Sequence, residues 1–277
     1  MKRILTVQDI SCVGKCSLTV ALPVISTFGI ETSVLPTAVL STHTMFKGFT
    51  FRDLTNDLEK ISEHWKKEEI TFDALYTGYL GSIKQIEICE NLFNDYKTSD
   101  NFILVDPVMA DNGKLYPGFT QEYADKMSKL CSKADVIVPN LTEASYMLHT
   151  PYVEKGYDEE YVRLMLRNLC NLGSKMAILT GISFTDNQLG VYAYDSRTDK
   201  YYSYFNKKIP VTFHGTGDIF ASALCGALTK FGDTQKALEI AVDFTVECID
   251  VTVKNGVKTW YGVEFEYALP YLMERIK

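Results

Sequence analysis

Short apolar segments alternate with longer amphipathic segments from residue 3 to residue 181, and this alternation constrains the fold more than any other feature of the sequence. The apolar segments are rich in β-branched residues and are followed by turn residues, which is typical of buried strands. They span residues 3–10, 32–42, 72–78, 101–109, 135–140 and 175–181. Intervening segments carry apolar residues at helical spacing, namely residues 50–69, 82–97, 120–134 and 158–173. This order predicts an α/β fold in which helices cover both faces of a parallel sheet.

The rhythm changes at Gln188. Residues 188–209 alternate in polarity around the polar turn 195–200, which predicts a β-hairpin. Three helical segments follow the hairpin, at residues 217–231, 233–254 and 263–276. The chain contains no linker, repeat or low-complexity segment. We therefore predict that residues 1–277 form one domain.

Composition limits the partners of the protein. The net charge of -7 argues against nucleic acid or an anionic membrane as the main partner, but it leaves an anionic small ligand open. The cysteines are odd in number and lack the spacing of a zinc site, so we expect reduced thiols in a cytoplasmic protein. Gln8 and Asp9 interrupt the apolar start before it could serve as a signal peptide, and no apolar run is long enough to span a membrane.

Polar side chains recur just after the predicted strands. In open parallel sheets, ligands bind at the carboxyl ends of the strands. The polar positions are Asp9–Ser11, His43–Thr44, Thr77–Tyr79, Asp106 with Asp111, Asn140 with Glu143, Thr180–Gly181 and the loop 214–218. Any one of these loops could be polar only because loops are exposed, but the whole set predicts a binding site at this edge of the sheet.

A Gly-Thr-Gly-Asp loop, Gly215 to Asp218, opens an apolar helix. Glycines let backbone N–H groups converge on an anion, and the helix N-terminus adds about half a positive charge. A phosphate-binding loop with an adjacent carboxylate suits phosphoryl transfer, in which Asp218 would deprotonate the attacking hydroxyl. The alternative interpretation is that Asp218 only caps the helix.

The Gly-Thr-Gly-Asp loop resembles the anion-hole motif of the ribokinase-like superfamily. Further blocks are similar to its vitamin-kinase branch, the pyridoxal and hydroxymethylpyrimidine kinases, and most of all to bacterial pyridoxal/pyridoxamine kinases. These blocks are LSTHT (40–44), YTGYLGS (76–82), VDPVMADNGKLY (105–116) and VPNLTEASYML (138–148). The resemblance runs from Thr6 to the last helices. It implies a three-layer α/β/α sandwich with a mainly parallel central sheet, and ATP-dependent phosphorylation of a hydroxymethyl group on a nitrogen heteroaromatic ring.

The same resemblance implies a role for individual residues. Asp218 matches the catalytic base, and Gly215, Thr216 and Gly217 match the anion hole. The positions that match substrate contacts are Ser11, Thr44 and Tyr79, together with Asp218. The positions that match ATP contacts are Asp106, Asn140, Glu143, Thr180 and Lys208. Asp111 and Tyr116 match a flap over the site.

The resemblance also implies cofactors and partners. Mg²⁺ is expected near Asp106 and Glu143, held through water, because carboxylate oxygens are the ligands it prefers. Activation by K⁺ is implied by the resemblance alone. The expected partners are a B6 vitamer and ATP, with neither nucleic acid nor membrane, in a homodimer.

Several assignments stay open. Residues 9–17 align with the family only after a shift, so Asp9 rather than Ser11 could face the ring. Cys12 could line the pocket or be a buried thiol, and Lys208 could approach ATP or be a solvated charge at a strand end. His43 either shapes the substrate loop or only packs, and His214 has no role that the sequence supports.

The sequence leaves two alternatives to the leading interpretation of the function. The leading interpretation is a pyridoxal/pyridoxamine/pyridoxine kinase of B6 salvage, because the LSTHT block favours the pyridoxal side. The first rival is a hydroxymethylpyrimidine (phosphate) kinase of thiamine synthesis. The second is a non-catalytic vitamin-binding protein on the same scaffold, against which the intact Asp218 and its glycines argue.

Overall fold

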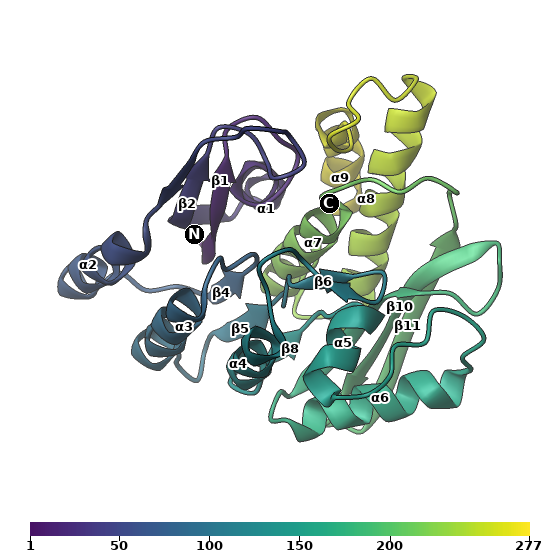
Figure 1. Ribbon diagram of the computed structural model, residues 1–277, viewed down its shortest axis with the longest axis horizontal. Coiled ribbons are helices and arrows are strands. Elements are labelled where there is room, and N and C mark those ends of the chain that lie inside the picture. The colour runs from purple at the N-terminus through teal and green to yellow at the C-terminus, as the bar shows by residue number, and fades with distance from the viewer.

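A nine-stranded sheet forms the centre of the protein in the computed structural model, which describes residues 1–277 (Figure 1). The strands are β1 (Arg3–Ser11), β2 (Glu31–Leu40), β3 (Phe51–Asp53), β4 (Ala74–Thr77), β5 (Phe102–Val105), β8 (Val136–Ile137), β9 (Met176–Ile182), β10 (Gln188–Asp195) and β11 (Lys200–Lys207). Their order is β11-β10-β9-β8-β5-β4-β1-β2-β3. The strands from β9 to β2 in this order are parallel, and β3, β10 and β11 add antiparallel pairs at the two edges. The predicted mainly parallel sheet is confirmed.

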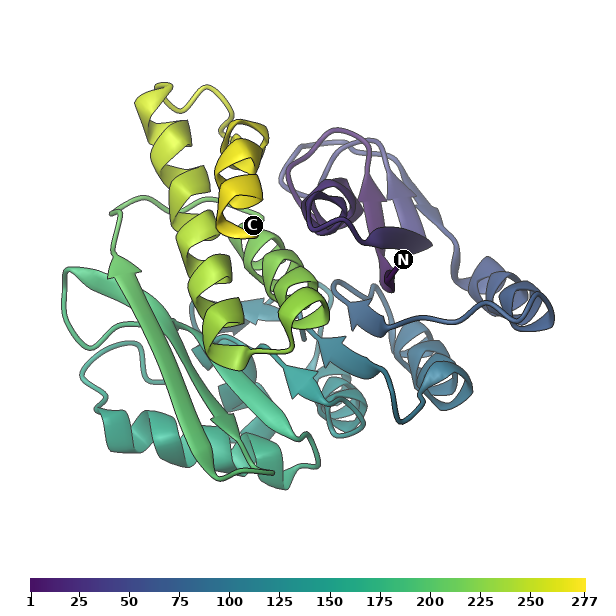
Figure 2. The same cartoon turned by 180° about the vertical axis from the view of Figure 1, so that it is seen from behind.

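Helices cover both faces of this sheet (Figures 1 and 2). One layer contains α1 (Leu18–Thr27), α7 (Thr216–Phe231), α8 (Thr234–Lys254) and α9 (Leu269–Arg275), with a short 3₁₀ turn at Phe265–Ala268. The other contains α2 (Thr55–Lys67), α3 (Ile83–Tyr96), α4 (Gln121–Cys131), α5 (Leu141–Leu148) and α6 (Glu159–Asn171). The expected three-layer α/β/α sandwich is therefore confirmed. None of the helices combines the length and the apolar character that crossing a membrane requires.

The central strands are buried on both faces, so consecutive side chains enter different cores. Ile4 packs with the α1 and α7 layer, whereas its neighbour Leu5 packs with the α3 and α4 layer. Burying one such side chain is worth about 1.5–3 kcal/mol, so a run of apolar residues is stable only where helices cover both sides of the sheet.

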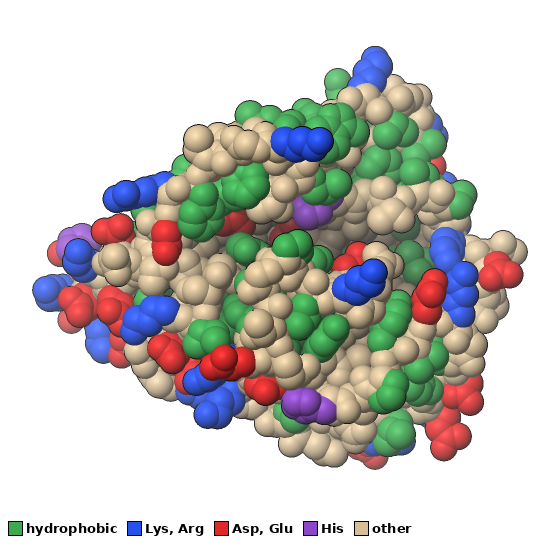
Figure 3. All heavy atoms as spheres, viewed as in Figure 1, with side chains coloured by type: hydrophobic (Ala, Val, Ile, Leu, Met, Phe, Trp, Pro, Cys, Tyr) green, Lys and Arg blue, Asp and Glu red, His purple; other side chains and the backbone are tan.

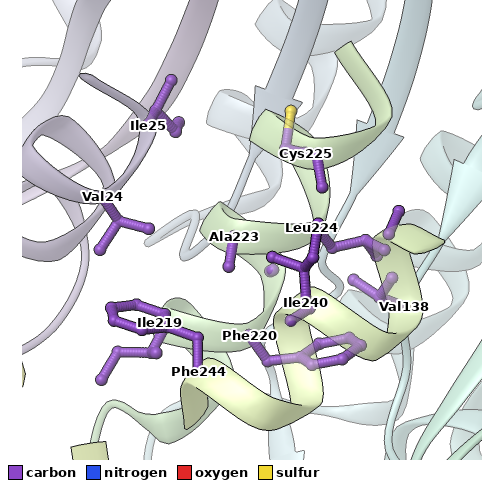
Figure 4. Packing of buried hydrophobic residues seen from close by; sticks show 14 of the residues in the cluster. Val24, Ile25, Val138, Ile219, Phe220, Ala223, Leu224, Cys225, Ile240 and Phe244 are labelled. Atoms are coloured by element: carbon purple, nitrogen blue, oxygen red, sulfur yellow. The ribbon is translucent and has the colours of Figure 1, made fainter. Parts of the chain in front are cut away.

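Helix α7 is packed on all sides, and this packing holds its N-terminus in place. Figure 4 shows its residues Ile219, Phe220, Ala223, Leu224 and Cys225 among Val24 and Ile25 of α1 and Ile240 and Phe244 of α8. The small residues allow a close approach, because a β-carbon on Gly226 would lie 2.5 Å from Cδ2 of Phe28. The Gly-Thr-Gly-Asp loop thus lies at the start of a helix, α7, that is tightly packed in the core.

Two parts of the helix and strand prediction need correction. The predicted helix 50–69 begins only at Thr55, because residues 51–53 pair with Ala38–Leu40 as the edge strand β3. The Asp53 carboxylate accepts a hydrogen bond from the Thr55 N–H (2.9 Å) and marks the change from strand to helix. The sequence also failed to indicate helices α1 and α5, since α1 is apolar on nearly every side and contains Pro23.

A small hairpin lies apart from the main sheet. It consists of β6 (Ala110–Asp111) and β7 (Lys114–Leu115) and joins β5 to α4. The Asn140 side chain donates to the Ala110 carbonyl (2.9 Å), and the Gly113 N–H donates to the Thr142 hydroxyl (3.0 Å). These bonds tie the hairpin to the start of α5, beside which Figure 1 shows it.

Candidate active site

The polar residues predicted from the sequence lie at the carboxyl ends of neighbouring strands. The strands β9, β8, β5, β4 and β1 that precede them are adjacent in the sheet. Asp106 follows β5 directly, and its N–H donates to the Thr77 carbonyl at the end of β4 (2.9 Å). Figure 3 shows a hollow across this face of the molecule, with acidic side chains inside it and a histidine at its rim.

The N-terminus of α7 carries no capping side chain. Its N-cap residue is Gly215, which has a φ of 82° in the left-handed region that favours glycine. A side chain caps each of the helices α3, α4, α5, α6 and α8, whereas α1, α2 and α9 lack such a cap, as α7 does. The first amides of a helix have no partner within the helix, so those of α7 are free to bind an anion.

Asp218 lies in the first turn of α7, three residues after the N-cap, and its carboxylate caps nothing. The interpretation of Asp218 as a plain helix cap is therefore wrong. Burial raises the pKa of its carboxyl group to about 7; the backbone amide of Ser17 opposes this shift and the charge of Asp9 adds to it. A carboxylate with a raised pKa beside free helix amides is suited to accepting a proton during catalysis.

The charge of Asp106 interacts with two other carboxyl groups, those of Glu143 and Asp218. Burial, followed by the negative charges of Glu143 and Asp218, raises the pKa of Asp106 well above its ordinary range. Burial also raises the pKa of Glu143, to about 8, although backbone N–H groups that include those of Asn140 and Met109 oppose the shift. The Tyr116 phenol belongs to the same cluster, because burial and these acidic groups raise its pKa.

Glu143 also has a structural role that the sequence did not reveal. It forms a capping box with Asn140: the Glu143 N–H donates to the Asn140 side chain, and the Asn140 N–H donates to the Glu143 carboxylate (both 2.9 Å). The other carboxylate oxygen accepts from the Met109 N–H (3.1 Å). The signal was present as the Asn-x-x-Glu spacing that typifies a capping box. Glu143 therefore joins the loop after β5 to the start of α5.

The two flap residues flank the small hairpin. Asp111 is exposed and accepts a hydrogen bond from the N–H of Asn112 (2.8 Å). Tyr116 lies at the base of the hairpin, where its N–H donates to the Met109 carbonyl (2.8 Å). One residue of the pair thus faces solvent, while the other approaches the acid cluster.

The two candidates for the ring contact near the N-terminus are hydrogen-bonded to each other. The buried carboxylate of Asp9 accepts from the hydroxyls of Ser11 (3.0 Å) and Ser17 (2.6 Å). Burial raises the pKa of Asp9, and the two serine hydroxyls oppose the shift. Cys12 is exposed, so its interpretation as a buried thiol is wrong. Tyr79 is half-buried, and its pKa is raised by burial and then by the charge of Asp9.

Three predicted contact residues make no side-chain hydrogen bond to the acid cluster. Thr180 is inside β9 rather than after it, and its N–H donates to the Pro139 carbonyl (3.0 Å). Lys208 is exposed and follows β11 directly. Thr44 is exposed in the loop after β2. The ligand contacts assigned to these residues stay predictions.

An aromatic cluster at the mouth of the site was missed. The His43 and His214 rings lie 4.9 Å apart, and the Phe46 and Trp260 rings lie 4.7 Å apart. Tyr261 completes the cluster, 5.5 Å from Phe46. Trp260 and Tyr261 come from the connection between α8 and the last helix, a segment to which the sequence assigned no role. The only local signal was an aromatic pair in a polar loop.

Comparison with known proteins supports a kinase site. A family model described as phosphomethylpyrimidine kinase matches residues 38–262. The chain is similar to a Bacteroides thetaiotaomicron protein crystallised with pyridoxal as a candidate phosphomethylpyrimidine kinase: 40% identity, 98% of this chain and 95% of that chain covered, TM-score 0.92. It is also similar to pyridoxal kinase from Lactobacillus plantarum, with 29% identity, 99% and 97% coverage and a TM-score of 0.90. Pyridoxal kinase from Leishmania donovani in complex with ADP and pyridoxamine shares the fold, with 21% identity, 98% and 96% coverage and a TM-score of 0.83.

Proposed function

The chain belongs to the phosphomethylpyrimidine kinase family, and from this premise we propose that it transfers the γ-phosphoryl group of ATP to the 5′-hydroxymethyl group of pyridoxal, pyridoxamine or pyridoxine. The observation that carries this proposal is the carboxylate of Asp218 beside the uncapped N-terminus of α7. A proton acceptor and an anion site within one helical turn are what transfer of a phosphoryl group to an alcohol needs.

The reaction follows from the roles of these residues. The free amides of Gly215, Thr216 and Gly217 bind the oxygens of the transferring phosphoryl group and stabilise the charge that develops on them. The substrate hydroxyl oxygen attacks the γ-phosphorus, and the bond between that phosphorus and the β,γ-bridging oxygen breaks. Asp218 accepts the hydroxyl proton as the new P–O bond forms, and ADP leaves. Packing of α7 between α1 and α8 holds the phosphoryl-binding amides and the Asp218 carboxylate in fixed positions relative to each other.

The acid cluster fits a Mg²⁺ ion. No hydrogen bond to the Asp106 carboxylate opposes the rise in its pKa. No protein donor therefore compensates the negative charge of this carboxylate. No three His, Cys, Asp or Glu side chains lie close enough together to hold a metal by themselves. Kinase Mg²⁺ is usually held by one or two carboxylates, waters and the substrate phosphates. Asp106 would hold it, and Glu143 would act through water, since both oxygens of Glu143 already accept backbone N–H groups. The bound ion would neutralise phosphate charge.

The remaining roles belong to the same proposal. Asn140, Thr180 and Lys208 would contact ATP, and the hairpin with Asp111 and Tyr116 would cover the phosphates. The substrate ring would lie near Tyr79, Thr44 and the hydrogen-bonded pair Asp9 and Ser11. The free cysteines suit a reducing cytoplasm. A homodimer and activation by K⁺ are supported by the family resemblance alone.

A second substrate is favoured by a specific observation. The matching family model and the 40% identical Bacteroides protein both carry the description phosphomethylpyrimidine kinase. Hydroxymethylpyrimidine has the same hydroxymethyl group on a nitrogen heteroaromatic ring, so the chemistry at Asp218 would be unchanged.

An ADP-release assay separates these substrates. The three B6 vitamers, hydroxymethylpyrimidine and its phosphate would each be supplied with ATP and Mg²⁺. We expect turnover of at least one B6 vitamer, with the pyrimidine slower. If the pyrimidine is consumed far faster than every vitamer, the vitamin B6 assignment is wrong. Full activity in excess chelator would refute the role of Mg²⁺.

A further inference from the structure

His43 contacts three other loops at the mouth of the site, each from a different part of the chain. Its Nε2 atom lies 3.0 Å from the Tyr261 carbonyl oxygen, and its ring lies 4.9 Å from the ring of His214. Gly14 packs on the same ring, because a β-carbon there would lie 3.1 Å from Cδ2 of His43. The His43 side chain is 2% exposed. It is therefore the point at which the loops around residues 14, 43, 214 and 261 meet.

The hydrogen bonds of His43 determine its protonation state. The Met45 N–H donates to Nδ1 (3.2 Å), so Nδ1 carries a lone pair and no proton. The proton must then be on Nε2, where it is donated to the Tyr261 carbonyl. A charged imidazolium would place an N–H on Nδ1 against the Met45 N–H. Only the neutral tautomer with the proton on Nε2 makes both bonds.

The charged and titratable groups around His43 do not reverse this preference. Burial lowers the pKa of His43, while the Tyr261 carbonyl and the charge of Asp9 on β1 oppose the shift. Burial and the neighbouring His43 lower the pKa of His214 as well. The Tyr261 ring lies 6.3 Å from the His43 ring. Lys15, which is in the same loop as Gly14, forms an ion pair with Glu266. Both imidazoles are therefore neutral at physiological pH.

We propose that His43 is a positioning residue that latches the loop 41–49 to the loop 257–262 in its uncharged form, and so holds the acceptor side of the site closed. This inference rests on the proposed kinase function, because the His43 ring packs on His214, the residue before the loop that carries the free amides and Asp218. The aromatic rings of Phe46, Trp260 and Tyr261 belong to the two loops that His43 joins, and they pack on one another. A flat heteroaromatic acceptor would be held less firmly once the loops separate.

The sign of the pH effect follows from the lowered pKa. The neutral latch is complete above the ordinary pKa of 6.5 and is lost as the pH falls through the lower value of the folded protein. Acid should therefore release the hydrogen bonds that join these loops.

Tryptophan fluorescence tests the latch without any enzyme assay. Trp260 lies 6.3 Å from the His43 ring, and the only other tryptophan is Trp65 on α2. In a Trp65→Phe background whose fold is verified by circular dichroism, we expect Trp260 emission to change in one step below pH 6.5. His43→Gln can donate to Tyr261 but cannot be charged, so its emission should not titrate. His64→Gln, on exposed α2, is the matched control and should titrate like the parent.

Kinetics provide the second readout. His43→Ala should raise KM for the acceptor by about tenfold, the effect of losing roughly one good hydrogen bond. The kcat and the KM for ATP should change much less, and His43→Gln should restore the acceptor KM and abolish its rise in acid. The latch is overturned if the step in Trp260 emission persists in His43→Gln. It is equally overturned if the parent protein shows no such step. Absence of kinase activity on every alcohol would refute the proposed function, while the fluorescence titration would still decide the latch.

Discussion

Gly215 and Lys15 are in direct backbone contact: a β-carbon on Gly215 would stand 1.9 Å from the Lys15 carbonyl oxygen. The two residues are 200 positions apart in the chain. The loop after β1 thus packs on the loop that opens α7, and both the contact and the left-handed backbone require glycine at position 215. This contact places the Asp9 and Ser17 side of the site against Asp218.

Replacing Gly215 should therefore damage stability and activity together. Gly215→Ala should cost more than the ~1–2 kcal/mol of left-handed strain alone, because the Lys15 segment must also move. Gly217→Ala is the matched control, since a β-carbon there meets no atom within 4 Å. Thermal unfolding and turnover of both variants check this. Equal stabilities for the two variants would contradict the close backbone contact between Gly215 and Lys15.

Asp218→Asn should separate catalysis from binding. A positioned general base contributes about 10²–10⁴-fold, so turnover should fall by roughly that factor. Affinity for ATP should be nearly unchanged, because the free amides of α7 remain. Steady-state kinetics and calorimetric titration with ATP give the two numbers. A folded Asp218→Asn protein with near wild-type turnover would refute the role of Asp218 as the base.

The raised pKa of Asp218 predicts a pH-dependent cost of folding. The unfolded carboxyl group ionises near 3.8, whereas the folded one keeps its proton until about pH 7. The folded state therefore binds more protons in this interval, and the contribution of Asp218 to stability falls as the pH rises through it. In metal-free buffer, the melting temperature of Asp218→Asn relative to the parent should be higher at pH 8 than at pH 4. A relative melting temperature that is the same at both values would argue against the burial of this charge.

Glu143 and Asp106 should respond differently to removal, although both belong to the acid cluster. Glu143→Ala leaves the N–H groups of Met109 and Asn140 without partners, at about 1–3 kcal/mol each. Asp106→Asn removes no such bond, so the protein should stay as stable while the Mg²⁺ concentration needed for half-maximal activity rises. Denaturant unfolding and Mg²⁺ titrations distinguish the two. If Asp106→Asn lost stability and Glu143→Ala did not, Asp106 rather than Glu143 would be the structural residue.

Much of the fold is determined by local patterns in the sequence. The alternation of short apolar and amphipathic segments specified a parallel sheet covered on both faces, because period and burial are properties of neighbouring residues. The Gly-Thr-Gly-Asp loop at the start of an apolar helix predicted an anion site from the same kind of local pattern, and the structure places this loop at the N-terminus of α7. The edge strand at residues 51–53 escaped prediction, since its pairing with Ala38–Leu40 overrides the helical pattern that runs through it.

The tertiary structure alone decided the chemistry of the site. Gly215 occupies the N-cap position, and the pKa of Asp218 is raised only because α7 is buried among α1 and α8 and brought beside Asp9. Asn140 and Glu143 show their capping box in the sequence, but not the bond that joins Glu143 to Met109, 34 residues away. The meeting of His43 with Tyr261 joins residues 218 apart. Such contacts depend on how loops from distant segments meet at one edge of the sheet, and no local period encodes that.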